Sequence, residues 1–500
     1  MGIRLRLSLI ALVLLAGCTT KGPDFERAAV PTTAGYAQTP KAPRKAPAAI
    51  AGEGPAHGWW KAFGSPELDA LVDRAMLNNH SLEASNATLA RARARIEAVA
   101  GRRLPQVDGS ARVEHEQVNL SAFGFDPAAF GGANGPVPNP EFDLYSVGGG
   151  VVYDLDLFGA NRRAVEQSVA QAESQLHQSE AAHLTIAGRV VAQVLTIAAI
   201  RERIRAVNAL IAEDQRNLKL TDARRRGGVG TMVEVLSAEG QLVSDQADLP
   251  QYDQQLAEAR AMLAILIGVS PAELGPADFA FSGFTLPPNI PVTLPSLLVA
   301  KRPDILQAES DLHAATAAIG IATARLYPNV TLGASLTQAV QGPGNLLGDN
   351  FRGFDIFAGL TAPIFHGGTL KAEKRGAEAA ARAAAATYQQ TVLEAFGQVS
   401  NLLAALGNDA RSVQNQSRAA DVSDRSLRLS RRSFQVGNSG ILQVLDASRL
   451  AQRARLALVE AKARQFLNVS RLYVATAGGW TGPAPEATAA VAGESARSQP

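Results

Sequence analysis

The chain has 500 residues with 48 basic and 46 acidic side chains, and its net charge of +2 argues against a nucleic-acid-binding protein. Its single cysteine, Cys18, excludes intrachain disulfides and cysteine-based metal sites. After residue 18 no apolar stretch reaches the roughly 20 residues of a membrane-spanning helix, so we expect any membrane crossing to use strands.

The first 18 residues predict a bacterial signal peptide that ends in a lipobox. Two arginines precede an apolar run over residues 9–15, and a small Ala-Gly pair stands directly before Cys18. The alternative, a membrane anchor helix, would need a longer apolar run. We therefore expect residues 1–17 to be removed and Cys18 to carry acyl chains. The lack of an Asp directly after this cysteine favours the outer membrane.

The two ends of the mature chain differ in composition from its middle. Residues 18–57 are rich in Pro, Ala, Gly and Thr with little periodicity, which predicts an extended, lipidated N-terminal arm. Residues 481–500 have the composition of a disordered tail.

The middle of the chain is dominated by a helical pattern. Apolar residues recur every seven positions at Leu68, Ala75, Leu82, Leu89 and Ile96. A seven-residue repeat indicates coiled-coil-like packing of neighbouring helices. Residues 161–226 contain no proline, nor do residues 368–434, and a helix of either length would span about 100 Å. Such lengths suit the wall of a duct, although a periplasmic adaptor hairpin has the same periodicity.

Two pairs of predicted strands interrupt the helices. Apolar and polar residues alternate on both sides of a Gly/Pro/Asn-rich loop, at about 105–157 and again at about 328–365. Four strands cannot close a barrel, and an open sheet edge cannot face lipid. Several copies would have to pool their strands, two giving eight and three giving twelve. The alternative is a soluble β-layer packed on the helices.

The chain also contains an internal duplication. The segment that begins at Leu89 aligns without gaps on the segment that begins at Leu312, and Gly228 aligns on Gly437. We expect a first structural repeat over residues 58–285 and a second over 286–480. Each repeat would run as helix, hairpin, long helix, turn and helix.

Several motifs in order give the chain a clear resemblance. They are CTTKGPDFERAAVP from Cys18, WWKAFGSPELDALVDRAMLNN from Trp59, YDLDLFGANRR from Tyr153, KRPDILQAESDL from Lys301, RLYPNVTL from Arg325, APIFHGG from Ala362, VLDASR from Val444 and LYVATAGGW ending at Trp480. With these motifs the chain resembles the TolC-like outer-membrane factors, in particular the lipoprotein branch of NodT type that serves resistance-nodulation-division pumps.

The resemblance implies the remaining architecture. The fold class is mainly α with a transmembrane β-barrel part, in which long coiled-coil-like helices form a periplasmic α-barrel tunnel. Each chain of a homotrimer would contribute four strands to a shared twelve-stranded barrel in the outer membrane. The expected partners are outer-membrane lipid, a periplasmic adaptor (membrane fusion protein) and an inner-membrane resistance-nodulation-division pump.

The resemblance also implies a periplasmic gate at the two repeated turns. The predicted gate residues are Glu234 in the first turn and Leu442, Asp446 and Arg449 in the second. Helical spacing puts the last three on one face, where the alternative is an ordinary exposed charge pair. The second turn departs from the family by carrying Phe434 where the family often has Tyr, and Gln443 where some members carry a further Asp.

Motifs of catalysis and cofactor binding are missing from the sequence. No HExxH pair, GxSxG elbow or phosphate-binding loop occurs, so we expect no catalytic residue, cofactor or metal. The Asp154-Leu155-Asp156 triplet is interpreted as structural. We therefore predict an outer-membrane channel that passively conducts small molecules such as drugs. The alternatives are a channel for type I protein secretion and a non-conducting periplasmic adaptor or structural lipoprotein.

Overall fold

The computed structural model describes residues 20–27, 29, 35–36, 47–52, 54–124, 139–275, 277–346, 348 and 352–477. The predicted signal peptide, Cys18 and the tail at 481–500 lie outside these residues. The main elements in chain order are β1 (Ala48–Gly52), α2 (Pro66–Asn78), α3 (His80–Gly101), β2 (Gln106–Gln117), β3 (Glu141–Asp154), α5 (Ala160–Arg226), α6 (Met232–Leu266), β4 (Asn289–Thr293), α7 (Pro295–Lys301), α8 (Pro303–Ala324), β5 (Asn329–Val340), β6 (Arg352–Thr361), α9 (Thr369–Gln435) and α10 (Ile441–Thr476).

Contacts between residues divide the chain into two compact units. The strand unit contains residues up to Arg27 together with Arg91–Ala172 and Ser310–Ala385. The helical unit contains Ala28–Ala90, Glu173–Glu309 and the residues from Ala386 on. Several helices pass from one unit into the other.

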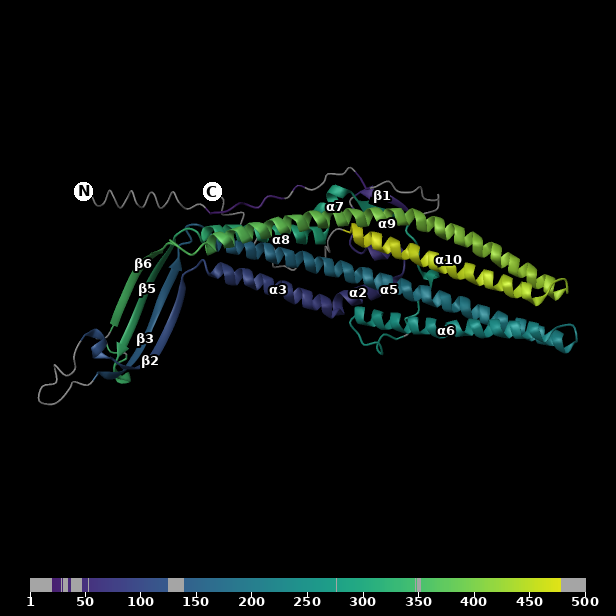
Figure 1. Cartoon of the computed structure of the whole chain (residues 1–500), viewed down its shortest axis with the longest axis horizontal. Helices are drawn as coiled ribbons and strands as arrows, with labels where there is room; N and C mark the ends of the chain where they lie inside the picture. The colour runs from purple at the N-terminus through teal and green to yellow at the C-terminus, as the bar shows by residue number, and fades with distance from the viewer. Residues whose placement is uncertain are drawn as a thin grey trace. The chain divides into compact units, whose positions relative to one another are not determined.

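The strand unit is built on one antiparallel sheet with the order β2-β3-β5-β6 (Figure 1). Strands β2 and β3 form the first predicted hairpin, and β5 and β6 form the second. The register places Val107 opposite Val151, Val151 opposite Ala334, and Ala334 opposite Ile356. Since directly opposite residues lie on the same face, the four strands share one apolar face.

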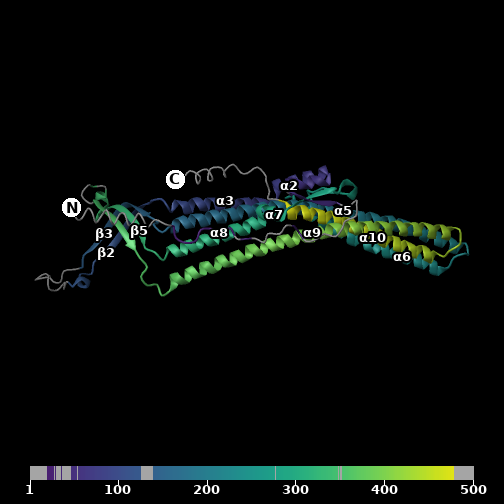
Figure 2. The ribbon, with the colours of Figure 1, turned by 90° about the horizontal axis from the view of Figure 1, so that it is seen from above.

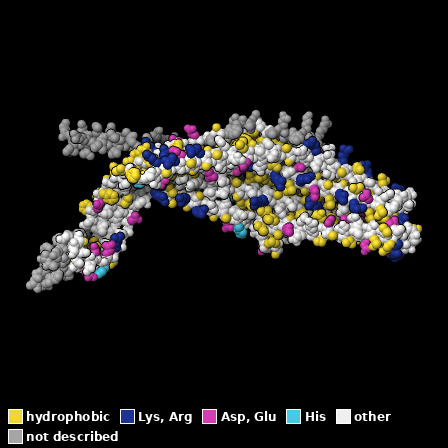
Figure 3. All heavy atoms as spheres, in the orientation of Figure 1, with side chains coloured by type: hydrophobic (Ala, Val, Ile, Leu, Met, Phe, Trp, Pro, Cys, Tyr) yellow, Lys and Arg dark blue, Asp and Glu magenta, His cyan; other side chains and the backbone are white. Residues whose placement is uncertain are grey.

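This apolar face is uncovered within a single chain. Phe354 and Ile356 on β6 are each 78% exposed, and Val107 on β2 is 77% exposed. The opposite face carries mostly small and polar residues, such as Ser110 and Ser335. Figure 3 shows hydrophobic side chains on the surface of these strands. Large uncovered apolar surfaces of this kind mark contact with a partner or a membrane.

The two predicted long helices are confirmed as α5 and α9, each of 67 residues. Helix α5 contains one window that is long and apolar enough to cross a membrane. The composition of this window contradicts the prediction that no stretch after residue 18 is long and apolar enough for a membrane-spanning helix. However, 61% of that window is buried inside the protein, which is typical of a core helix.

The segment Thr20–Arg27 docks on the strand unit through Arg163 of α5. The Arg163 guanidinium contacts the carboxylates of Asp24 and Glu166, each at 2.6 Å, and its side chain is only 6% exposed. Glu166 also pairs with His313 of α8 at 3.1 Å, and the His313 ring stacks on Phe25 at 4.5 Å. We call this set of five residues the Arg163 latch. It fixes the start of the described chain by packing and charge together.

The same N-terminal segment also contacts the junction between β3 and α5. The backbone N–H of Lys21 donates to the carbonyl of Phe158 at 3.1 Å. Gly159 lies against Thr20, and a Cβ at this glycine would come within 2.8 Å of the Thr20 side chain. The segment is therefore held where the strands of the sheet meet the helices.

The helical unit has a continuous core that extends along α2, α3, α5, α6 and α10. The predicted seven-residue pattern is confirmed at its first four positions, from Leu68 to Leu89, which are all buried. The helix nevertheless breaks at Asn79, whose side-chain amide donates to the carbonyl of Leu266 at 2.7 Å. Figure 2 shows α5, α6, α9 and α10 running alongside one another in this unit.

One strand pair was not predicted from the sequence. Strand β1 pairs in parallel with β4, with Ala48 opposite Asn289. The sequence of β1 is AAIAG, which has little of the β-branched and aromatic content that marks a strand. Its pairing depends on the distant partner and had no local signal.

Candidate functional site

The predicted gate lies at the end of the helical unit, where α5 turns into α6 and α9 turns into α10 (Figures 1 and 2). The two turns have the same backbone. Gly228 and Gly437 have left-handed φ values of 76° and 82°, a conformation that glycine adopts without steric cost. The N–H of Val229 donates to the carbonyl of Arg224 at 3.0 Å, and the N–H of Asn438 donates to that of Ser433 at 2.9 Å.

The two turns differ at the start of the helix that follows. In the first, the Thr231 hydroxyl accepts from the Glu234 N–H at 3.3 Å, and the Glu234 carboxylate accepts from the Thr231 N–H at 2.8 Å. This capping box satisfies two N–H groups at the start of α6. In the second turn, Gly440 precedes α10 without a side-chain cap. Glu234, a predicted gate residue, therefore has a structural role in capping α6.

The other three predicted gate residues share an exposed face of α10. Leu442 is 57% exposed, and Asp446 and Arg449 are exposed as well. The opposite face of this helix is buried and begins with Ile441. Among the described residues, neither Asp446 nor Arg449 has an ion-pair partner, and the hydrogen bonds of Glu234 go to Thr231 rather than to this face. The face is thus free to contact another chain.

A buried aromatic residue joins the two turns. Phe434 of α9 is 3% exposed and packs in a small core with Leu427, Ile441 and Val444. The Arg224 guanidinium of α5 lies 4.6 Å from the Phe434 ring centre and donates to the Phe434 carbonyl at 3.2 Å. This cation–π contact links the two helical hairpins directly beside the gate. Sequence reasoning noted Phe434 but did not find its partner, because the two lie in different repeats.

A second link between α5 and α9 lies just behind this aromatic contact. The Glu213 carboxylate forms ion pairs with Arg431 of α9 and, at 3.4 Å, with Arg216 of its own helix. A cavity of about 290 Å³ opens beside these residues and is also lined by Phe434. Burial holds the pKa of the Arg431 guanidinium below its ordinary value, and the neighbouring Arg455 adds to this effect. Near the gate, α5 and α9 are therefore connected by ion pairs as well as by packing.

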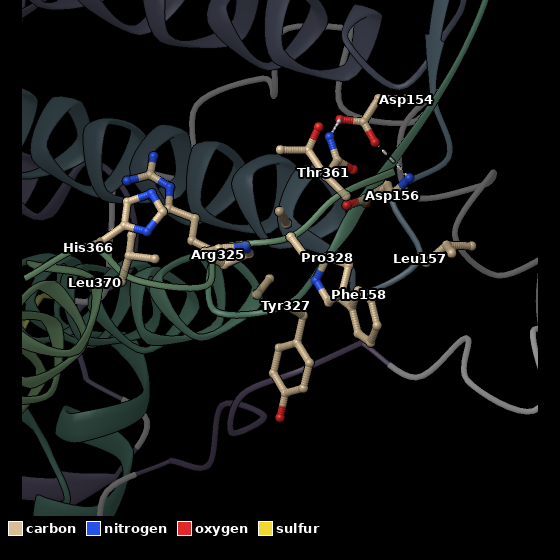
Figure 4. Close-up of a pocket in the computed structure, with 15 residues that line it drawn as sticks. Asp154, Asp156, Leu157, Phe158, Arg325, Tyr327, Pro328, Thr361, His366 and Leu370 are labelled. Atoms are coloured by element: carbon tan, nitrogen blue, oxygen red, sulfur yellow. Dashed lines mark hydrogen bonds between the residues drawn. The ribbon is translucent and has the colours of Figure 1, made fainter. Parts of the chain in front are cut away.

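A larger pocket of about 350 Å³ lies in the strand unit, where strands and helices meet (Figure 4). Its lining includes Asp154, Asp156, Phe158 and Tyr327, and the two aromatic rings stack at 4.7 Å. Asp156 accepts from two N–H groups in the first turn of α5, those of Asn161 and Arg162, each at 2.9 Å.

Both aspartates of this pocket accept hydrogen bonds from backbone N–H groups. Asp154 accepts from the N–H of Asp156 at 2.9 Å and from the side-chain amide of Asn329 at 3.1 Å. Asp156 has a φ of 46°, a left-handed value that Asp tolerates better than most residues. These hydrogen bonds give both aspartates a structural role at the junction of β3 and α5. Among the described residues, no group of three or more His, Cys, Asp or Glu is placed to hold a metal ion.

Known proteins are similar to this chain in both sequence and fold. Residues 71–269 and 294–478 match the outer membrane efflux protein family. The pyoverdine export outer membrane protein OpmQ of Pseudomonas aeruginosa is 30% identical over 84% of this chain and 87% of its own length. The probable outer membrane lipoprotein SilC of Salmonella typhimurium is 24% identical over 95% of this chain and 98% of its own.

A solved structure agrees with these relatives. The outer-membrane channel OprN superimposes with a TM-score of 0.79 at 27% identity, covering 93% of this chain and all of its own. The predicted TolC-like architecture and outer-membrane location are therefore confirmed, and the family consists of channel proteins rather than enzymes. The chain belongs to the outer membrane efflux protein family.

Proposed function

We propose that three copies of this protein form a passive outer-membrane conduit of a tripartite efflux system, with no chemical step of its own. The observation that carries the proposal is the open four-stranded sheet with an uncovered apolar face. Among the described strands, β2 and β6 each have a neighbour on one side only. In a bilayer their free N–H and C=O groups need partners, and a second and third chain supply them.

Three chains give a closed barrel of twelve strands. Channels of this family act as trimers in tripartite systems, which supports three copies over two. The apolar face with Val107 and Ile356 would then face lipid, and the polar face would line the lumen. The helical unit would extend the path into the periplasm, where an adaptor and a resistance-nodulation-division pump supply the energy.

The gate proposal follows from the exposed face of α10. In a trimer, Asp446 and Arg449 would contribute three acidic and three basic side chains near the axis, with Leu442 as an apolar contact. Ion pairs in such a ring hold a narrow opening closed, and the acidic side chains favour cations in the pore. Two features support it: the lack of partners for both charges among the described residues and the position of this face beside the turn.

Lipid attachment and cargo are proposed from the sequence together with two relatives. The lipobox at Cys18 and the lipoprotein SilC, similar over nearly the whole chain, support acylation. The relative OpmQ is named for the export of a compound, pyoverdine, which favours small-molecule efflux over protein secretion. We place the acylated Cys18 two residues before Thr20, which docks at the junction of strands and helices.

The first test is the oligomeric state. We expect the purified protein in detergent to have three times the mass of the mature chain by light scattering, because four strands per chain close a barrel only when chains combine. In planar bilayers the same preparation should form ion channels. A stable monomer would contradict the shared barrel, and a trimer that never conducts would favour the adaptor interpretation.

The second test uses adjacent residues on opposite faces of β6. Ile356→Lys should strongly reduce assembled channel in the outer membrane, since a lysine facing lipid near the bilayer midplane costs about 2–4 kcal/mol. Asp355→Lys, one residue away, should assemble normally and shift the pore towards anions. Outer-membrane fractionation and reversal-potential measurements check both variants. If both variants assemble equally well, the proposal that Ile356 faces lipid and Asp355 faces the lumen is wrong.

A further inference from the structure

Two buried carboxyl groups face each other inside the helical unit. Asp214 of α5 is fully buried, and Asp245 of α6 is 4% exposed. Their side chains lie within hydrogen-bonding reach of each other, although ionised carboxylates can only accept. Because both are buried within one chain, assembly with other copies cannot expose them.

The two aspartates have unequal surroundings. Asp245 accepts from the amide of Gln241 at 2.8 Å, on its own helix, and from the amide of Gln452 on α10 at 3.2 Å. Among the described residues, no donor with hydrogen-bond geometry reaches either carboxyl oxygen of Asp214. The nearby Asn217 amide favours the charged form of Asp214 only weakly. Asp245 is therefore suited to be the carboxylate, and Asp214 the acid.

We propose that Asp214 and Asp245 share one buried proton, which fastens α5 to α6 and, through Gln452, to α10. The Asp214 carboxyl donates to the Asp245 carboxylate, so a single negative charge is spread over the pair. Ser448, which is 1% exposed, lies one helical turn before Gln452 on the same buried face of α10. Of the exposed gate residues, Arg449 lies between these two positions along the helix, and Asp446 lies two residues before Ser448.

Burial, together with the adjacent Asp245 carboxylate, raises the pKa of Asp214 to about 8. Two arginines on neighbouring helices pair with other carboxylates. Arg431 of α9 pairs with Glu213, and Arg455 of α10 pairs with Asp424 of α9 at 2.9 Å. Both of these guanidinium groups are thus already paired with other carboxylates.

The sign of the pH effect follows from these values. The folded protein holds the proton up to a pH of about 8, whereas an unfolded aspartate releases it near 3.8. The folded state therefore binds more protons between these values, and the pair makes stability fall as pH rises through this window. Above it, two buried like charges repel, and we expect α10 to be held less firmly beside the gate.

The first measurement concerns the proton alone. Asp214→Asn supplies a permanent neutral donor, so its melting temperature in detergent should rise relative to wild type between pH 5 and pH 8 and then level off, by about 2 °C or more. The matched control is Asp248→Asn, which removes an exposed carboxylate of α6 and should follow wild type. A difference that does not change with pH would overturn the shared proton.

A spectroscopic readout covers the case in which Asp214→Asn fails to fold. Wild type should show the infrared carbonyl band of a protonated carboxylic acid at pH 7, and the band should vanish at pH 10. Asp245→Asn removes the neighbouring negative charge while Asp214 stays buried, so in this second variant the alkaline loss of stability should become smaller without disappearing. A wild-type protein without this band at pH 7 would contradict the proposal.

The second measurement concerns the coupling to the gate and rests on the proposed channel function. Wild-type conductance in planar bilayers should increase as pH rises from 7 to 9.5, whereas Asp214→Asn should remain constant. If wild type never conducts, the channel proposal fails while the melting and infrared data still decide the proton. If both proteins conduct with the same pH dependence, the coupling to the gate is overturned.

Discussion

A Cys18→Ser variant is expected to lose all of its covalently bound fatty acid, the largest change of any single substitution proposed for this protein. The thiol of Cys18 is the only group in the chain that can take the thioether-linked lipid of a lipoprotein, and serine cannot replace it. Metabolic labelling with radioactive palmitate checks this directly. Thr19→Ser, which leaves the cysteine in place, is the matched control and should label like wild type.

The same variant should still assemble. Arg163 holds Asp24, and the Lys21 N–H donates to Phe158, so the docking of the N-terminal segment does not require the acyl chains. Light scattering of the Cys18→Ser protein should therefore give the trimeric mass. Undiminished label on this variant would remove the lipobox interpretation, and labelled wild type with monomeric Cys18→Ser would show that the lipid guides assembly.

Opening of the gate is the second large effect that we expect. Asp446→Ala leaves Arg449 unpaired in a confined ring, where like charges repel more strongly than in bulk water, so conductance should rise severalfold. The double change Asp446→Ala with Arg449→Ala removes both members of the proposed ion pair between protomers, and it should also raise conductance. Leu442→Ala should do so by removing the apolar contact that narrows the opening.

Single-channel recording at low salt is the measurement for all three variants, because added salt screens a charge latch. Asp421→Ala on α9 is the matched control, since it removes an exposed carboxylate on a different helix. Wild-type conductance in all three gate variants would return Leu442, Asp446 and Arg449 to an ordinary solvated surface.

The sequence predicted those parts of the fold whose environment repeats along the chain. Strands β2, β3, β5 and β6 alternate between an apolar and a polar face, and this alternation is visible in residues such as Val107 and Asp108. Helices α5 and α9 were predicted within one residue at each end, because both stretches lack proline and are flanked by glycines. Each of these signals is local.

The contacts that the sequence did not reveal join distant segments. Asp214 and Asp245 are 31 positions apart on separate helices, and in the sequence each looks like a solvated acid. The sequence likewise does not indicate that the Arg224 guanidinium packs on the Phe434 ring. Only the packing of α5 against α6, α9 and α10 brings these groups together, so burial and charge had to be seen in three dimensions.

The equal lengths of α5 and α9, 67 residues each, constrain how this protein can change during evolution. Inserting one residue in the middle of either helix turns everything beyond it by about 100° and shifts it by about 1.5 Å. The apolar residues that follow a buried side chain such as Val194 or Val399 would then face water instead of the core. We expect relatives with longer or shorter tunnels to differ by whole heptads, added or removed in both long helices and in their returning partners together.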